Sequence, residues 1–211
     1  DRYMAIEDAD GLVAALADAG TLEAAGDAIL APLGDGTLGS AARPWGGTLV
    51  LDGNLAGGLL AEIAVSPLFR DADLRVVPAS PVKALRLRPL MAHPRATFHL
   101  NRAEAEVLAG RPFADAPSAA AGLLSGGARR AVVTDGADAC ADGTAGAGIV
   151  TGRPPAVAVS RITGAGDAFM AAHLVAERGG AGRSDALAAA LRAAAAHVSA
   201  PAADTPGGGM A

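Results

Sequence analysis

The chain has 211 residues but few of the residue types that cross-link small folds or fill large cores. It contains one cysteine, Cys140, which excludes an internal disulfide framework and fits a reducing compartment. Aromatic residues make up 3% of the chain, whereas hydrophobic residues as a whole make up 51%. The core must therefore be built from Leu, Val and Ala, which favours close packing of helices on a sheet.

Positive charge and long apolar segments are also scarce. The net charge is −5 and Lys83 is the sole lysine, so the chain offers no general attraction to nucleic acid or anionic membranes. The longest apolar tract, Ala186–Val198, is rich in Ala, contains Arg192 and is too short to cross a bilayer. The opening residues lack the basic and apolar regions of a secretory signal. We expect a soluble, cytoplasmic protein that binds neither nucleic acid nor membranes.

Several common catalytic patterns are missing as well. The sequence has neither a Gly-x-x-x-x-Gly-Lys-Ser/Thr phosphate loop nor the Gly-x-Ser-x-Gly elbow of α/β-hydrolases. The histidines do not pair with Cys140 or with carboxylates at metal-ligand spacings, which argues against a structural zinc site. We expect each of them at the surface or at a strand end: His93, His99, His173 and His197.

The order of β-like and helical segments predicts an α/β fold. Residues 2–8 and 12–17 are β-like runs on either side of Ala9-Asp10-Gly11, whose Asp-Gly pair is typical of a tight hairpin turn, so they predict a two-stranded ribbon. From about residue 46, buried strands alternate with Ala/Leu-rich helices, which predicts a mostly parallel sheet covered on both faces. We expect strands at residues 47–52, 74–78, 97–100, 130–134 and 157–160. We expect helices at residues 57–64, 102–109, 166–176 and 184–198. Residues 141–156 are expected to form a loop or β-excursion, and residues 200–211 a frayed tail.

Ligands of parallel α/β sheets bind beyond the carboxyl ends of the strands. We therefore expect the functional residues in the segments that follow the strands, which are 52–54, 78–80, 101–104, 134–136 and 163–167.

The most informative of these segments is Thr163-Gly164-Ala165-Gly166-Asp167, which follows an expected strand and opens an expected helix. Its small residues allow backbone N–H groups to approach an anion, and the helix dipole adds positive potential there. Asp167, in the first helical turn, can accept a proton from an alcohol placed beside that anion site. By pattern alone, a tight strand-to-helix turn with a helix-start carboxylate is an equally good interpretation.

Residues 163–169 resemble the C-terminal signature of the PfkB, or ribokinase-like, family of sugar and nucleoside kinases. A second motif of that family is matched by Asn101-Arg102-Ala103-Glu104-Ala105. The resemblance covers most of residues 2–200. Within the family the chain most resembles the pseudouridine kinases, on the stretches 3–6, 10–11, 17–18, 52–55 and 78–83.

The resemblance implies a ribokinase-like three-layer sandwich with a mostly parallel central sheet and a small β-ribbon lid. It divides the chain into a lid segment at 1–20, a kinase core at 21–200 and a tail at 201–211. Family members carry a longer N-terminal part that grips the acceptor, and this chain begins with Asp1 rather than Met. We therefore expect that the N-terminal part of the core is missing from the sequence.

The resemblance also implies roles for individual residues. Asp167 would take the proton of the acceptor hydroxyl, while the amides of Gly164, Ala165 and Gly166 would stabilise the transferred phosphoryl group. Asn101 and Glu104 would act near Mg²⁺ and the ATP phosphates through water, a mode that suits Mg²⁺. By spacing alone, this pair is the better match to a helix cap. The resemblance further implies that the nucleotide is contacted by Thr134, Gly136, Thr163 and Lys83. The acceptor would be contacted by Tyr3 and by Asn54, which is close to Asp52 in the sequence.

Each of these further residues has a plainer interpretation. Thr134-Asp135-Gly136 and Asp52-Gly53-Asn54 are also ordinary turn sequences. Lys83 could neutralise a phosphate as a point charge, or be a solvated lysine at a helix start. Tyr3 fits packing within the ribbon better than contact with a sugar.

Three positions depart from the family pattern. Ala139 stands where a second glycine is expected near the nucleotide, and Arg161 stands where Asp is frequent, which weakens the inference of a monovalent-cation site. Val77 replaces an Asp that pseudouridine kinases tend to carry, and this could change metal or phosphate handling.

The sequence thus predicts an enzyme that transfers phosphate from ATP to a primary hydroxyl of a small sugar or nucleoside, with Mg²⁺. Pseudouridine is the first candidate acceptor, and ribose, fructose or another nucleoside are alternatives. A non-catalytic ligand-binding remnant of the family is the rival hypothesis. Whether the ribbon closes as a lid or pairs across a homodimer stays open.

Overall fold

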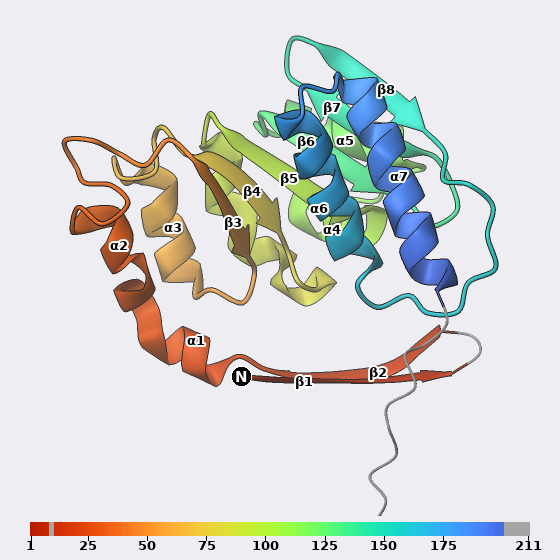
Figure 1. Cartoon of the computed structure of the whole chain (residues 1–211), viewed down its shortest axis with the longest axis horizontal. Helices are drawn as coiled ribbons and strands as arrows, with labels where there is room; N and C mark the ends of the chain where they lie inside the picture. The colour runs from red at the N-terminus through yellow and green to blue at the C-terminus, as the bar shows by residue number, and fades with distance from the viewer. Residues whose placement is uncertain (9–10, 201–211) are drawn as a thin grey trace, which may run out of the picture. The chain divides into compact units, whose positions relative to one another are not determined.

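The computed structural model describes residues 1–8 and 11–200, and these form two compact units. The first unit comprises residues 1–2 and 18–153, and the second comprises residues 3–17 together with the chain from Pro154 onward. Each unit is described by itself (Figure 1). The tail expected at 201–211 and the ribbon turn at residues 9–10 lie outside the described residues.

A six-stranded sheet forms the centre of the first unit, in the order β3-β4-β5-β6-β7-β8. The strands are β3 (Thr48–Asp52), β4 (Asp73–Val77), β5 (Ala96–Asn101), β6 (Arg130–Thr134), β7 (Cys140–Thr144) and β8 (Gly148–Gly152). Strands β3 to β6 pair in parallel, and β7 and β8 add antiparallel strands at one side. The mostly parallel sheet is therefore confirmed, and the β-excursion expected at 141–156 is the β7–β8 hairpin.

Helices that connect the parallel strands form one layer of the first unit (Figure 1). They are α3 (Gly57–Val65), the 3₁₀ helix η2 (Pro81–Ala92), α4 (Arg102–Ala109) and α5 (Ala116–Ser125). Neighbours contact one another in the order α3, η2, α4 and α5, and α5 also packs on β6 and β7. Three short helices precede the sheet: α1 (Gly20–Ala25), η1 (Gly26–Leu30) and α2 (Ala31–Gly34).

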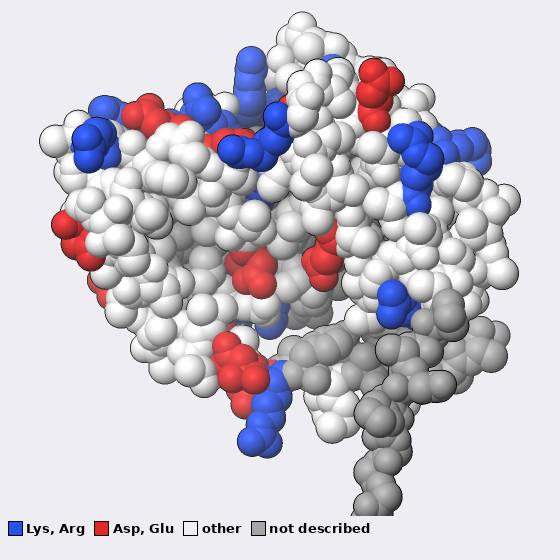
Figure 2. Space-filling view, viewed as in Figure 1, with Lys and Arg blue, Asp and Glu red and all other residues white. Residues whose placement is uncertain are grey.

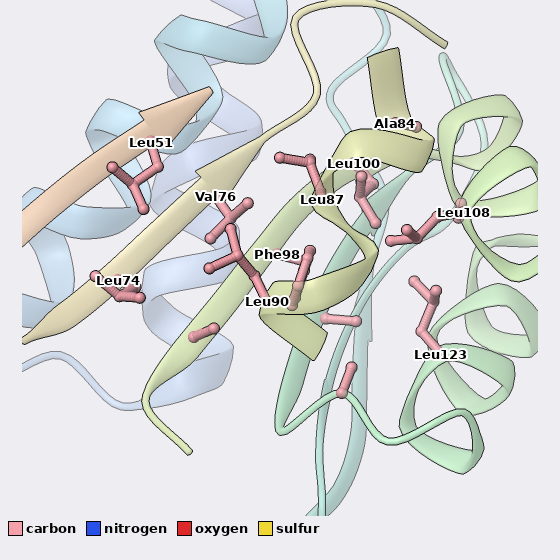
Figure 3. Close-up of a cluster of buried hydrophobic side chains, with 14 of the residues drawn as sticks. Leu51, Leu74, Val76, Ala84, Leu87, Leu90, Phe98, Leu100, Leu108 and Leu123 are labelled. Atoms are coloured by element: carbon pink, nitrogen blue, oxygen red, sulfur yellow. The ribbon is translucent and has the colours of Figure 1, made fainter. Parts of the chain in front are cut away.

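The core between this layer and the sheet is aliphatic, as the composition predicts. Figure 3 shows Leu74 and Val76 of β4 and Phe98 of β5 facing Leu87 and Leu90 of η2. All five side chains are fully buried. Because few aromatic rings are available, these branched side chains exclude water by close interdigitation.

Sequence reasoning missed η2 and α5 for identifiable reasons. Helix η2 contains Pro89 and is wound as a 3₁₀ helix, so it lacks the 3.6-residue apolar period by which α-helices are found. Helix α5 is Ala-rich, and its start is set by a capping box between Asp115 and Ser118.

The second unit holds a two-stranded ribbon and two helices. The ribbon strands β1 (Arg2–Asp8) and β2 (Gly11–Asp18) pair as expected. Helices α6 (Ala165–Arg178) and α7 (Arg183–Ser199) pack against each other.

The strand expected at 157–160 is wrong. Pro154 and Pro155 lack backbone donors, and the N–H groups of Ser160 and Arg161 donate to the Val198 carbonyl, at 2.7 and 3.2 Å. The segment is therefore held by the end of α7 rather than by a sheet.

Charged side chains are spread thinly over the surface in Figure 2, where acidic and basic groups are interspersed and most of the visible face is uncharged. Among the described residues, no helix is long and apolar enough to cross a membrane.

One charged pair is buried inside the sheet. Arg130 of β6 makes two hydrogen bonds to Asp142 of β7, at 2.9 and 2.7 Å, and the Asp142 side chain is 0% exposed. Close to Asp142, burial raises the pKa of the Cys140 thiol to about 12, and the Asp142 carboxylate contributes to the increase.

We expect Asp142→Asn to lower the free energy of unfolding by about 3 to 5 kcal/mol, because it removes the fully buried carboxylate that pairs with Arg130, whose side chain is 15% exposed. Denaturant unfolding measures this change. Asp138→Asn is the matched control, since that side chain is 77% exposed and lies 3.5 Å from Arg153. It should change stability by at most about 0.5 kcal/mol. Equal effects of the two substitutions would contradict the buried pair.

The high pKa of Cys140 predicts a loss of stability at alkaline pH. The thiol stays neutral in the folded chain but ionises near its ordinary pKa of 9.0 once unfolded, so the free energy of unfolding should fall as pH rises from 9.0 towards about 12. Unfolding of the wild type and of Cys140→Ala, measured across this range, isolates the contribution. Parallel pH profiles for the two proteins would show that the buried thiol does not titrate as described.

Candidate functional site

The loops after β3 and β4 form one hydrogen-bonded cluster. Parallel pairing places Asp52 opposite Val77, so the two loops start side by side. The Asn54 side chain donates to Asp52 Oδ2 at 2.7 Å, and its backbone N–H donates to Asp52 Oδ1 at 3.0 Å. Lys83 Nζ in turn donates to Asn54 Oδ1. The three predicted residues Asp52, Asn54 and Lys83 are thus brought together, and Lys83 is half-buried rather than fully solvated.

Close backbone contact holds this cluster in place. A Cβ on Gly53 would collide with the Pro78 carbonyl and with the Lys83 side chain, so only glycine fits. One residue further on, Ala79 has φ of +63°, a left-handed conformation that costs a non-glycine residue roughly 1–2 kcal/mol. Such strain is typical of functional segments. Sequence patterns gave no sign of it.

The loops after β5 and β6 form a second cluster at the same edge of the sheet. Asn101 pairs in register with Thr134. Asn101 and Glu104 form a reciprocal capping box: the Glu104 N–H donates to Asn101 Oδ1 at 2.9 Å, and the Asn101 N–H donates to Glu104 Oε2 at 2.8 Å. The helix-cap interpretation of this pair is therefore confirmed, and Thr134 Oγ1 donates to the Leu100 carbonyl at 3.4 Å.

Arg102 ties β6 to the start of α4. Its guanidinium contacts Asp135 at 2.7 Å, Glu106 at 2.8 Å and the Phe113 carbonyl at 3.3 Å. Gly136 follows with φ of +57°, a conformation that suits glycine. Asp135 is therefore neutralised within the fold.

Glu104 is electrostatically different from Asp135. Partial burial raises the pKa of its carboxyl above the ordinary value, and the hydrogen bond from the Asn101 N–H opposes that increase. Within the described part of the chain, no cationic side chain faces it. A cation placed nearby would favour the ionised form. Of these two carboxylates, Glu104 is the one available to a cation.

No group of three or more His, Cys, Asp or Glu side chains that could hold a metal ion occurs in residues 1–8 and 11–200. Mg²⁺ differs from zinc in keeping several waters and binding through one or two carboxylates together with substrate phosphates. The donor set at this edge, the Glu104 carboxylate and the Asn101 amide, fits only that water-mediated mode.

The segment Thr163–Asp167 belongs to the second unit, where it opens α6. Gly164 has φ of +86° and precedes the first helical residue. The Ala165 N–H donates to the Ile162 carbonyl at 3.1 Å, so it is engaged within the turn. The N–H groups of Gly164 and Gly166 have no acceptor among the described residues, and Asp167 is exposed in the first turn. Two amides that have no acceptor in the described part of the chain and one carboxylate thus belong to the same helix start.

The end of α7 supports this turn, which sequence reasoning did not foresee. His197 Nε2 donates to the Thr163 carbonyl at 2.8 Å. The Arg161 guanidinium donates to two acceptors of His197, the backbone carbonyl at 3.1 Å and ring atom Nδ1 at 3.3 Å. The departure from the family pattern at Arg161 therefore has a structural role. The expected position at the surface or at a strand end is wrong for His93, His99 and His173, which are buried. Tertiary contacts, which the sequence does not display, decide these positions.

Comparison with known proteins identifies the family. The model of the pfkB family carbohydrate kinases matches residues 55–207. The chain belongs to this family. The match includes both clusters of the first unit apart from residues 52–54, and the whole glycine turn of the second.

Solved structures of kinases resemble the chain as well. A carbohydrate kinase from Agrobacterium tumefaciens is 28% identical, with a TM-score of 0.70 over 92% of this chain and 60% of its own. Ribokinase from Arabidopsis thaliana, solved with ribose and ATP, is 21% identical with a TM-score of 0.62 over 74% of this chain and 50% of its own. This chain therefore spans about half to three fifths of these relatives. A search of curated proteins finds no match.

Other relatives support the fold. Adenosine kinase from Sinorhizobium meliloti is 21% identical, with a TM-score of 0.58 over 70% of this chain and 47% of its own. The mostly parallel α/β sheet with flanking helices is that of ribokinase-like proteins.

Tyr3, the residue predicted to contact the acceptor, lies on strand β1.

The glycine turn generates a paired prediction. Gly164→Ala should lower the free energy of unfolding by about 1 to 2 kcal/mol, because an L-residue is strained at this φ and its Cβ would lie 3.0 Å from His197 Nε2. Gly166→Ala, in open space at a helical position, should raise it by up to about 1 kcal/mol. Denaturant unfolding compares the two. Similar changes in both variants would contradict the described turn.

Proposed function

We propose that the chain is part of an ATP-dependent cytoplasmic kinase that phosphorylates a primary hydroxyl of a nucleoside or sugar. The main support is the glycine turn that opens α6. There the N–H groups of Gly164 and Gly166 have no acceptor among residues 1–8 and 11–200, and the exposed carboxylate of Asp167 follows in the first helical turn. The helix start adds positive potential to these amides, which favours the negative charge of a transferred phosphoryl group. Family membership supports the same reaction class.

Asp167 is proposed as the general base. The acceptor hydroxyl gives its proton to the Asp167 carboxylate while its oxygen bonds to the γ-phosphorus of ATP. The bond from that phosphorus to the bridging oxygen breaks, and ADP leaves. Positioning and electrostatics carry such reactions, and no covalent phosphoenzyme is needed.

The first unit is proposed to hold the nucleotide. Mg²⁺, when bound, would neutralise charge on the phosphates. Glu104 and Asn101 would hold it through water, and Glu104 makes no ion pair in the described part of the chain that would compete. Thr134, Gly136 and Thr163 are each proposed to contact the nucleotide. Lys83 would add a positive charge near the phosphates.

The acceptor is proposed to be pseudouridine, phosphorylated at its 5′-hydroxyl, with ribose, fructose and other nucleosides as alternatives. Asn54 and Tyr3 are each proposed to contact the acceptor, Tyr3 as part of a ribbon lid. Ribokinase of Arabidopsis, solved with ribose and ATP, and adenosine kinase of Sinorhizobium justify including both substrate classes in a test. If the ribbon instead pairs across a homodimer, the protein will sediment at twice its monomer mass.

The test measures ADP release by the protein expressed from its complete coding sequence, with Mg-ATP and pseudouridine, uridine, adenosine, ribose or fructose. We expect turnover with one class of acceptor and a fall in kcat of about 10² to 10⁴ in Asp167→Asn.

Asp185→Asn is the matched control, because Asp185 is an exposed aspartate in the first turn of α7. It should retain wild-type turnover, and both variants should keep the wild-type melting temperature. Full activity in Asp167→Asn would overturn the proposed base. Acceptor binding without turnover in the wild type would instead assign the chain to non-catalytic ligand binding.

A further inference from the structure

A pocket lies in the first unit, away from the strand ends described above. It has a volume of about 620 Å³, within the range of small-molecule sites. Its lining comes from the final parts of η2, α4 and α5: Arg88, Met91, Ala92, Leu108, Ala109, Arg111, Gly122, Leu123, Ser125, Gly126 and Gly127. Helix α4 starts at the carboxyl end of β5 and runs back, so this pocket lies at the opposite edge of the sheet.

Two guanidinium groups of the pocket are fixed by neutral partners. Arg88 Nη2 donates to the Leu108 carbonyl at 3.1 Å. The Arg111 guanidinium stacks on the Phe113 ring, 4.7 Å from its centroid. Gly122 makes this stack possible, since a Cβ there would collide with the ring and lie 2.8 Å from Arg111 Nη2. These contacts orient both groups without neutralising their charge.

The surroundings reinforce that positive charge. None of the lining residues is acidic. Residues 86–130 contain seven arginines and three acidic residues, although the whole chain carries −5. Those acidic residues are engaged elsewhere: Glu104 and Asp115 cap helix starts, and Glu106 pairs with Arg102. The pocket is therefore a local basic site in an acidic protein.

The floor of the pocket is apolar. Leu108 and Leu123, labelled in Figure 3, come from α4 and α5 and are buried to 1% and 0% exposure. Met91 contributes a flexible thioether from η2. The rim at Ser125, Gly126 and Gly127 has almost no side-chain bulk, which leaves the entrance open. An occupant would meet an apolar surface on one side and guanidinium donors on the other.

We propose that this pocket binds a small organic anion, a metabolite that joins a phosphate or carboxylate group to an apolar body. Arg88 and Arg111 supply planar donors that match such oxyanions. Both line the same pocket, and Arg88 reaches the segment that carries Arg111, since Arg88 Nη2 is 3.9 Å from the position a Cβ would take on the neighbouring Gly110. The apolar body lies against Met91, Ala92 and Ala109, apolar lining residues that keep part of their surface accessible. This site is independent of the proposed phosphoryl transfer.

Phenyl phosphate is the test probe, since it combines both features, and phenol and inorganic phosphate each lack one. Calorimetry is run on the full protein with Mg-ATP analogue present to occupy the nucleotide site. We expect phenyl phosphate to bind more tightly than either fragment. The Arg88→Gln/Arg111→Gln pair should weaken its binding at least about tenfold, the order of two lost charge-assisted contacts.

Arg95→Gln/Arg129→Gln is the matched control, because both arginines are exposed in the same segment but do not line the pocket. It should change the Kd by no more than about twofold. Ser125→Trp keeps both pocket arginines and fills the entrance, so it should also abolish binding.

The proposal would be overturned by no binding of phenyl phosphate, by equal weakening in the two arginine pairs, or by unchanged binding in Ser125→Trp. Binding of a poly-glutamate peptide that exceeds that of phenyl phosphate and needs Arg88 and Arg111 would assign the surface to a polymer and overturn it as well. Turnover with Mg-ATP, followed in parallel, reports on the kinase alone and should be unaffected in all three variants.

Discussion

The parallel pairing of β3 to β6 is the constraint on which the first unit depends. Because these strands run in the same direction and neighbour one another, the loops that follow them begin at one edge. A single reversed strand would carry its loop to the other edge. Residues separated by more than eighty positions in the sequence, Asp52 and Thr134 among them, therefore share an edge without any direct bond between them.

Arginine contacts then fix the loops that this pairing collects. Arg102 joins β6, α4 and the Phe113 carbonyl, while Arg86 joins Glu23 to the carbonyls of Gly53 and Leu55. In the second unit Arg161 holds His197. A guanidinium can satisfy several acceptors at fixed angles, which a lysine cannot. This explains how a chain with one lysine uses most of its cationic side chains as structural ties.

Local signals decided how much could be predicted from sequence. Strand 130–134 and helix 102–109 were predicted to the residue, because the helix carries a cap at Asn101 and a stop at Gly110. The prediction of a strand at 157–160 was wrong. Apolar residues do alternate in this segment, but two prolines precede it, and the backbone N–H groups at its end donate to α7 instead of to a sheet. The roles of His197 and Arg161, and the strain at Ala79, arise from contacts between distant segments, so no local pattern reveals them.

The capping box at Asn101 and Glu104 has a consequence for how relatives of this chain are classified. Both side chains satisfy backbone groups at the start of α4, so selection for folding alone is enough to retain them after turnover is lost. Asp167 is exposed, and the described residues show no comparable structural duty for it. In a set of homologues, drift at the Asp167 position would therefore separate degenerate members from working enzymes, whereas an intact Asn-x-x-Glu would not.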